Sequence, residues 1–275
     1  MTKRRAYLHL GLDDGSGEVV AATLAQRRQA LAELGVRSPR DGETLLRAAA
    51  ELLHTHREWG YRRADVEGAW TRLVEECRAG RDTVVLSVPQ LAAADPGQAA
   101  LALDALAGFE VHLVVTVHAP DAWTLAGDPA RDLAPVLERW SSVFPNRRRL
   151  HVVVTDGDAT TWAELGRVAG FGTRSVAATA GAMSRTRHAH PVPASRRGVA
   201  ERLAATWAEL LREGGYDVRG DLRNLTPDVA DAPAEDDATL LTALAELERL
   251  QRRNEALEGQ VATLRRRRRR FLVAS

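Results

Sequence analysis

Four short apolar runs recur along the first two thirds of the chain and predict buried β-strands. The runs are RAYLHLGL (5–12), DTVVLSV (82–88), EVHLVVTV (110–117) and RLHVVVTD (149–156). Each run is rich in valine or leucine and is bounded by polar or glycine-containing segments. Such runs are typical of strands that are covered on both faces, as in a parallel sheet.

Longer segments between these runs have apolar residues at helical spacing. They cover residues 18–34, 41–57, 64–79, 97–107, 130–142 and 160–169, and a further helix is expected at about 197–213, ending at the Gly214-Gly215 pair. Residues 172–196 have no clear period and predict a loop or lid. Strands that alternate with helices imply right-handed crossovers, so the expected fold is an α/β sandwich around a parallel sheet.

The pattern changes at the C-terminus. An acidic linker is expected at 229–238, after an α/β domain at 1–228, and a coiled-coil helix with an arginine-rich end at 239–275. Apolar residues there recur in heptads, and the expected dimer interface is Leu247, Leu250, Asn254, Leu257, Val261 and Leu264. A single asparagine at an a position favours a parallel two-stranded register. The alternative is one amphipathic helix packed on its own domain.

The distribution of charge shows one feature, a run of arginines near the C-terminus. The net charge is only +1, but residues Arg265 to Arg270 are six consecutive arginines. They suit a solvated helix end, where positive charge complements the helix dipole. They also suit contact with an anionic partner such as nucleic acid, acidic lipid or an acidic protein. Specific DNA recognition is not expected, because the basic run follows the heptads instead of preceding them.

Cysteine content and hydropathy argue against disulfide-rich, cysteine-zinc and membrane-spanning proteins. Cys77 is the only cysteine, which excludes an internal disulfide framework and a multi-cysteine zinc site. Its segment has helical periodicity, so a buried helix residue is expected instead of a nucleophile. The sequence has no apolar run of 18 residues, so no transmembrane segment is expected. These features fit a cytoplasmic protein.

The stretch LHLGLDDGSGE (8–18) has the layout of a phosphate-binding loop between a strand and a helix. Gly11, Gly15, Ser16 and Gly17 could supply backbone amides to an anion. Asp13, Asp14 and Glu18 would oppose that anion, since like charges 4 Å apart repel by about 4 kcal/mol at an effective dielectric near 20. The alternative is that Asp14 and Glu18 cap the helix themselves.

Other polar residues predict no catalytic set and no metal site. His54 and His56 would point to different faces of a predicted helix, and His188 and His190 lie in the predicted loop. Asp158 is expected to be the N-cap of the helix after the fourth strand. No Ser-His-Asp arrangement follows from the spacing. Most of the six tryptophans are expected to be packing residues: Trp59, Trp70, Trp123, Trp140, Trp162 and Trp207.

The order of these segments resembles that of the actinobacterial sulfotransferase-family proteins, which are P-loop-related enzymes. The stretch YLHLGLDDGSGEVVAATLAQRRQALAELGV is similar to the family's first strand, PKTGTT-type loop and NRxxLxxxGV helix end. WAELLREGGYDVRGDLRNLTPD is similar to its closing helix and GYDVVGDLxDLLP signature. The resemblance covers about residues 5–228. It implies a P-loop fold and the cofactor 3′-phosphoadenosine-5′-phosphosulfate.

The chain departs from this family where the chemistry should occur. Asp14 stands in place of the loop lysine, Asp13 in place of the loop proline, and Gly17 and Glu18 in place of hydroxyl residues. Val88 and Pro89 replace a His-Glu pair that is suited to act as a general base. His118 replaces the arginine that would hold the 3′-phosphate.

These departures imply a vestigial cofactor site and an uncertain enzymatic status. The expected function is therefore a non-catalytic, sulfotransferase-like binding or scaffold protein with no cofactor. Two alternatives stay open. One is an active sulfotransferase with an atypical loop, in which an arginine from 185–197 replaces the lysine. The other is a coiled-coil dimer that binds anionic surfaces through its arginine tail.

Overall fold

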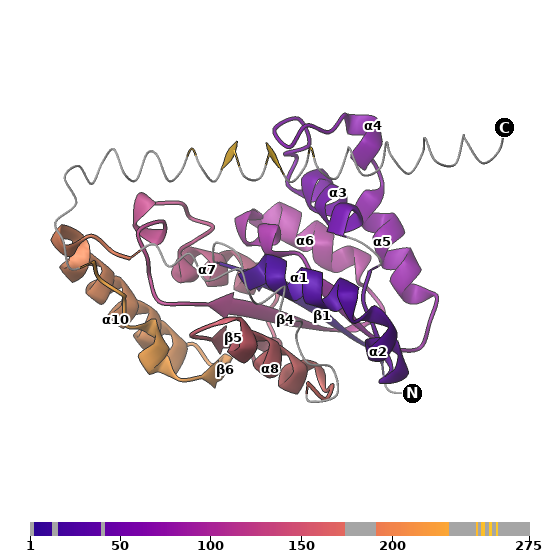
Figure 1. Cartoon of the computed structure of the whole chain (residues 1–275). Helices are drawn as coiled ribbons and strands as arrows, with labels where there is room; N and C mark the ends of the chain where they lie inside the picture. The colour runs from indigo at the N-terminus through magenta and orange to yellow at the C-terminus, as the bar shows by residue number, and fades with distance from the viewer. Residues whose placement is uncertain are drawn as a thin grey trace.

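A six-stranded, all-parallel sheet forms the centre of the protein (Figure 1). The computed structural model describes residues 3–12, 16–39, 42–173 and 191–230, together with residues 246, 249, 250, 253, 254 and 257. The strands are β1 (Arg5–Gly11), β2 (Val36–Arg37), β3 (Thr83–Ser87), β4 (Glu110–Val117), β5 (Leu150–Val154) and β6 (Asp217–Gly220), in the order β2-β3-β1-β4-β5-β6.

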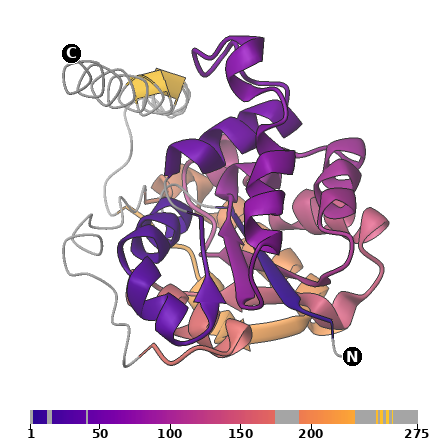
Figure 2. The same ribbon diagram turned by 90° about the vertical axis from the view of Figure 1, so that its right-hand side faces the viewer.

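Helices cover both faces of this sheet (Figure 2). One face packs against α1 (Ser16–Gln26), α2 (Arg28–Glu33) and α8 (Asp158–Ala169). The other packs against α3 (Gly42–Leu52), α5 (Ala69–Arg78), α6 (Pro96–Ala105), α7 (Leu133–Val143) and α10 (Arg197–Glu213). A short helix, α4 (Arg63–Val66), lies between α3 and α5. The predicted parallel α/β class is therefore confirmed, and the architecture is compatible with a P-loop-like fold.

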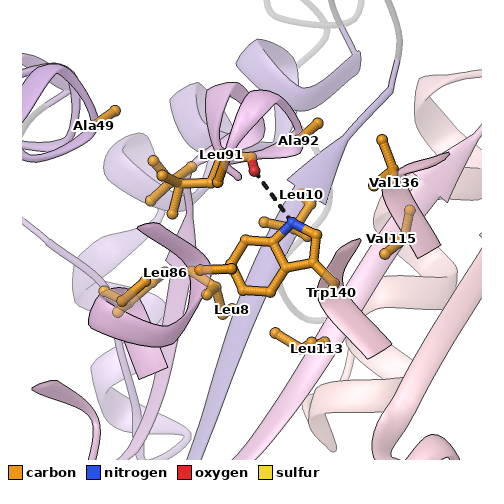
Figure 3. Close-up of a cluster of buried hydrophobic side chains, with 14 of the residues drawn as sticks. Leu8, Leu10, Ala49, Leu86, Leu91, Ala92, Leu113, Val115, Val136 and Trp140 are labelled. Atoms are coloured by element: carbon orange, nitrogen blue, oxygen red, sulfur yellow. Dashed lines mark hydrogen bonds between the residues drawn. The ribbon is translucent and has the colours of Figure 1, made fainter. Parts of the chain in front are cut away.

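Successive side chains along each strand point to opposite faces of the sheet, so the hydrophobic core has two layers. Leu8 and Leu10 of β1 face the larger layer, where Trp140 of α7 is fully buried and donates its indole N–H to the carbonyl of Leu91 at 3.2 Å (Figure 3). Tyr7, which directly precedes Leu8, faces the smaller layer under α1 and α8. All six tryptophans are buried, which confirms that they are packing residues.

The predicted elements match the structure closely in the middle of the chain and less well at turns. The four predicted strands correspond to β1, β3, β4 and β5, and α10 ends at Glu213, directly before the glycine pair. The predicted helix at 18–34 is two helices, and the one at 64–79 is divided by Gly68, whose φ of 72° favours glycine. Strands β2 and β6 were not predicted, because they are too short to have a distinct apolar pattern.

Two further predictions about helix ends were wrong. The helix predicted at 41–57 ends at Leu52, and His54 adopts a φ of +59°, so His54 and His56 are not on a helix. Helix α8 begins at Asp158, with Gly157 at the N-cap position, so Asp158 is not the N-cap. Both errors concern the residue at which a helix begins or ends. The spacing of apolar residues does not determine that residue.

The C-terminal predictions fall mostly outside the described residues. Val192 pairs with the backbone of Asp228 and Ala230, which ties the start of the predicted linker to the domain. The heptad residues Leu250, Asn254 and Leu257 are helical and exposed, while Leu247, Val261, Leu264 and the arginine run lie outside the described part of the chain. Among the described residues, no helix is long and apolar enough to cross a membrane.

Candidate functional site

The carboxyl ends of β1, β3, β4 and β5 meet at one edge of the sheet, where open α/β sheets bind ligands. The chain leaves β1 toward β2 and leaves β4 toward β5, so the connections diverge at the end of β1. β1 ends at Gly11, opposite Thr116 of β4, and the amide of Leu12 donates to the carbonyl of Thr116 at 3.3 Å. The chain then turns into α1, which begins at Ser16.

This turn contains the predicted cofactor loop. Asp13, Asp14 and Gly15 lie outside the described residues. The two interpretations of this loop, an anion site and a helix cap, therefore stay predictions. Ser16, Gly17 and Glu18 form the first turn of α1. An acidic residue in the first turn complements the helix dipole, as the capping interpretation of Glu18 requires.

A fully buried polar network lies on β1, β3 and β4 beside this turn. Nδ1 of His9 is 2.8 Å from Oγ of Ser87, and Nε2 of His9 is 3.1 Å from Oγ1 of Thr116. The three side chains are at most 1% exposed. The hydroxyl of Thr116 also donates to the carbonyl of Leu10 at 3.4 Å, and the tautomer of His9 sets which of its ring nitrogens donates.

This network resembles a serine activated by a base, but its burial argues for a structural role. A nucleophile needs access to its substrate, and in this structure His9 and Ser87 are shut away between the sheet and the helix layer. The sequence contained a signal for the network: His9, Ser87 and Thr116 are polar residues inside otherwise apolar strands. Their mutual contact, over 78 and 107 positions, depends on the strand order.

The position after β3 carries no group that could act as a base. Val88 is fully buried, and its amide donates to the carbonyl of His9 at 2.9 Å. Pro89 is buried at the start of the 3-10 helix η1 (Pro89–Ala93). The two positions at which the resemblance implies a His-Glu pair are therefore packed into the apolar layer beside β1.

His118 follows β4 and is held against the end of β5. Its Nδ1 is 2.9 Å from the carbonyl oxygen of Thr155, which can only accept, so Nδ1 carries a proton. The ring therefore has at most one further N–H, on Nε2, for a phosphate oxygen. An arginine in this position would retain several donors.

Arginine side chains elsewhere at this edge are engaged or distant in sequence from the loop. Arg131, in the connection between β4 and α7, is 7% exposed and stacks over Trp123 at 4.4 Å. Arg196 ends the 3-10 helix η4 (Ala194–Arg196) and Arg197 begins α10, while Arg185 and Arg187 lie outside the described residues. The active-enzyme alternative requires an arginine from 185–197 directed at the loop, and it stays a prediction because Asp13, Asp14 and Gly15 lie outside the described residues.

The part of the chain that the structure describes contains no reactive thiol and no cluster of metal-ligating side chains. Cys77 is 2% exposed on α5, and burial raises the pKa of its thiol to about 11, which keeps the unreactive thiol form. No group of three or more metal-ligating side chains occurs among the described residues. His188 and His190 lie outside them.

Comparisons with known proteins do not assign a family. Neither family models nor curated proteins nor solved structures gave a match to this chain.

Proposed function

We propose that this chain is a sulfotransferase-like α/β protein that does not transfer a sulfuryl group and acts as a binding or scaffold protein. The observation that carries this proposal is the packing of Val88 and Pro89. Sulfuryl transfer needs a group that removes the proton of the acceptor. At the end of β3, beside the candidate loop, the chain offers two buried apolar side chains instead.

The neighbouring polar groups support the same proposal. The side chains of His9 and Ser87 are bonded within a buried network, and Nδ1–H of His118 donates to the carbonyl oxygen of Thr155. Binding of a bisphosphorylated nucleotide requires several donors that point outward. At the described end of β4, the imidazole of His118 has at most one further N–H for such a contact.

The scaffold part of the proposal is a homodimer formed by the C-terminal helix. Leu250 and Leu257 are seven positions apart and are 49% and 46% exposed in the single chain. Asn254 lies on the same helical face, four positions after Leu250. A second copy in the same register would cover this face, and Arg253 would lie close to Glu258 of the second chain.

Calorimetric titration with 3′-phosphoadenosine-5′-phosphate tests the proposal. We expect no heat of binding for the unaltered protein. The variant Asp14→Lys with Glu18→Thr replaces two acids of the loop by a cation and a hydroxyl, and we expect weak binding to appear in it. The charge-matched control is Asp104→Lys with Glu75→Thr, at two exposed positions on α6 and α5.

Each outcome distinguishes the candidate functions. Binding by the unaltered protein in the low micromolar range would contradict the proposal and favour an active sulfotransferase. Binding by both double variants would mean that added positive charge alone attracts the nucleotide. If neither variant binds, the defect includes His118 and residues 172–196. Deleting residues 265–275 and measuring salt-dependent binding to DNA or acidic vesicles tests the arginine tail.

A further inference from the structure

Two histidines lie end to end near the amino ends of β4 and β5, away from the candidate site. Nδ1 of His112 is 2.9 Å from Nε2 of His151, the ring centroids are 5.2 Å apart and the ring planes differ by 13°. This centroid separation is about the largest that the nitrogen distance allows, so the facing nitrogens lie on the line between the ring centres. The contact has the geometry of a hydrogen bond in the plane of both rings.

A carboxylate lies beyond each ring. Nδ1 of His151 is 2.6 Å from Oδ2 of Asp217, and Nε2 of His112 is 3.2 Å from Oε1 of Glu110. We call these four side chains, in the order Glu110, His112, His151 and Asp217, the histidine line. The side chains of its two histidines are only 13% and 10% exposed, so water cannot replace these contacts easily.

Charged and titratable groups from several elements surround the histidine line. They are Arg5 and Tyr7 of β1, Arg149 of the 3-10 helix η3 (Arg147–Arg149) and Arg219 of β6, while helix α8 on the same face of the sheet carries an ion pair between Glu164 and Arg167. Two of these arginines lie 3.5 and 3.8 Å from the carboxylate of Glu110, and Arg219 lies 3.1 Å from that of Asp217. Both acids therefore have arginine as well as histidine partners.

The short contact with Asp217 fixes the direction of the hydrogen bonds when both rings are neutral. Burial acts to raise the pKa of Asp217, but the hydrogen bonds from His151 and Arg219 outweigh burial and lower it, so the carboxylate is ionised and accepts. Nδ1–H of His151 therefore donates to Asp217, and Nε2 of His151 accepts from Nδ1–H of His112. Two neutral imidazoles thus satisfy both contacts of His151.

The folded pair has room for one additional proton. Nε2 of His112, which carries a lone pair in the neutral state, can take up a proton and donate to Glu110. A second proton would have to bind Nε2 of His151, which already faces Nδ1–H of His112 at 2.9 Å. Since an N–H bond is about 1 Å long, the two hydrogens would then lie about 1 Å apart. Both rings cannot be imidazolium ions in this arrangement.

We propose that the histidine line is an acid-sensitive fastening of the edge strand β6, in which the folded pair of histidines holds at most one additional proton and a second proton separates the rings. β6 has four residues and is paired on one side only, with β5. The contact between His151 and Asp217 joins the side chain of its first residue to β5. When the ring of His151 turns away from His112, this contact is weakened and β6 is held less firmly.

The pKa directions of the two rings agree with this arrangement. Burial lowers the pKa of His112 and of His151, and this effect outweighs the opposing hydrogen bonds with Glu110 and Asp217. The neighbouring ring lowers the pKa of His112 further. The neutral pair is therefore the native form at neutral pH, and each added proton is opposed by burial or by the charge of the other ring.

A direct hydrogen bond fits the facing nitrogens better than a metal ion. Zinc lies about 2.0–2.1 Å from each imidazole nitrogen, and a tetrahedral site holds the two nitrogens about 3.3 Å apart. The observed separation is 2.9 Å. In addition, no third ligand joins the two rings among the described residues.

The limit of one proton fixes the sign of the pH dependence. In the unfolded chain each histidine has a pKa of about 6.5, so the two together take up two protons as the pH falls below that value. The folded pair takes up fewer, so stability falls as the pH decreases. The stabilisation is complete above about pH 6.5 and is lost progressively between about pH 6.5 and about pH 5.

Urea unfolding of the full chain between about pH 7.5 and about pH 5 tests the proposal. In His112→Gln the amide oxygen can accept from Nε2–H of His151, so the remaining ring can be protonated in the folded state. We expect the urea midpoint of the unaltered protein to fall more steeply with decreasing pH than that of His112→Gln, by a slope that corresponds to about one proton. Both proteins have the same carboxylates, so the difference belongs to the histidines. The matched control is His56→Gln, which removes an imidazole outside the histidine line and should keep the steep fall.

Nitrogen-15 NMR of histidine-labelled protein counts the protons directly. We expect no more than one imidazolium ring in the pair while the protein is folded. We also expect the amides of β6 to lose protection from hydrogen exchange at acidic pH in the unaltered protein but not in His112→Gln. Two imidazolium rings in the folded protein at about pH 5 would overturn the proposal. So would an equal pH dependence of the urea midpoint in the unaltered protein and in His112→Gln.

Discussion

Gly220 ends β6 and lies opposite Val154 of β5. Its φ is +87°, and a Cβ added there would lie 1.9 Å from the carbonyl oxygen of Val154. Glycine is therefore required twice, for the backbone angle and for the space. The same glycine belongs to the GYDVRGDL segment, so a position that resembles a family signature has a local steric reason in this chain.

We predict that Gly220→Ala lowers the free energy of unfolding by about 3 kcal/mol, because strain and a backbone clash add. The matched control is Gly108→Ala, where φ is +98° but no atom lies within 4 Å of the added Cβ. That variant should lose only the about 1–2 kcal/mol that a positive φ costs. Urea unfolding measures both, and equal losses would contradict the steric argument.

At the scale of elements, one helix supplies the cap of another. Helix α5 begins after Gly68, which has no side chain to accept from the free amides of the first turn. Glu51 of α3 takes that role: its carboxylate accepts from the amide of Gly68 and, at 2.8 Å, from the amide of Trp70. The packing of α3 on α5 is therefore polar at this end as well as apolar.

We predict that Glu51→Gln lowers the free energy of unfolding by about 1–2 kcal/mol. The amide keeps one acceptor oxygen but loses the second acceptor and the negative charge at the helix start. Glu75→Gln, on the exposed side of α5, is the control and should change stability by less than about 0.5 kcal/mol. Thermal or urea unfolding would contradict the capping role if the two variants behaved alike.

At the scale of the whole molecule, the open question is the number of chains. Leu250 and Leu257 leave about half of their surface in solvent, and apolar burial contributes about 25 cal/mol per Å². A series of such leucines over several heptads stabilises a dimer only if the predicted register continues through Val261 and Leu264.

We predict that the full chain sediments as a dimer and that a chain ending at residue 238 sediments as a monomer. Leu257→Asp should shift the full chain to monomer at micromolar concentration, because a charge at a d position opposes burial. The control is Leu101→Asp, at a leucine that is 56% exposed on α6 and outside the heptads. A monomeric full chain would favour the alternative of a single helix packed on its own domain.

Sequence pattern alone determined the class of fold and the main elements. The runs at β1, β3, β4 and β5 are mostly apolar on both faces, and this composition is typical of strands that are covered from both sides. The end of α10 could be predicted as well, because a glycine pair stops a helix by local backbone geometry. Each of these signals lies within a few residues of the element that it predicts.

Only the tertiary structure decided which polar residues meet. His9 with Ser87, His112 with His151, and Glu51 with the start of α5 are contacts between elements, and strand order and helix packing set them. Strand β6 also depends on its neighbour, since four residues form a strand only when β5 offers its edge. A sequence shows which side chains could form such contacts. The fold brings them within hydrogen-bonding distance.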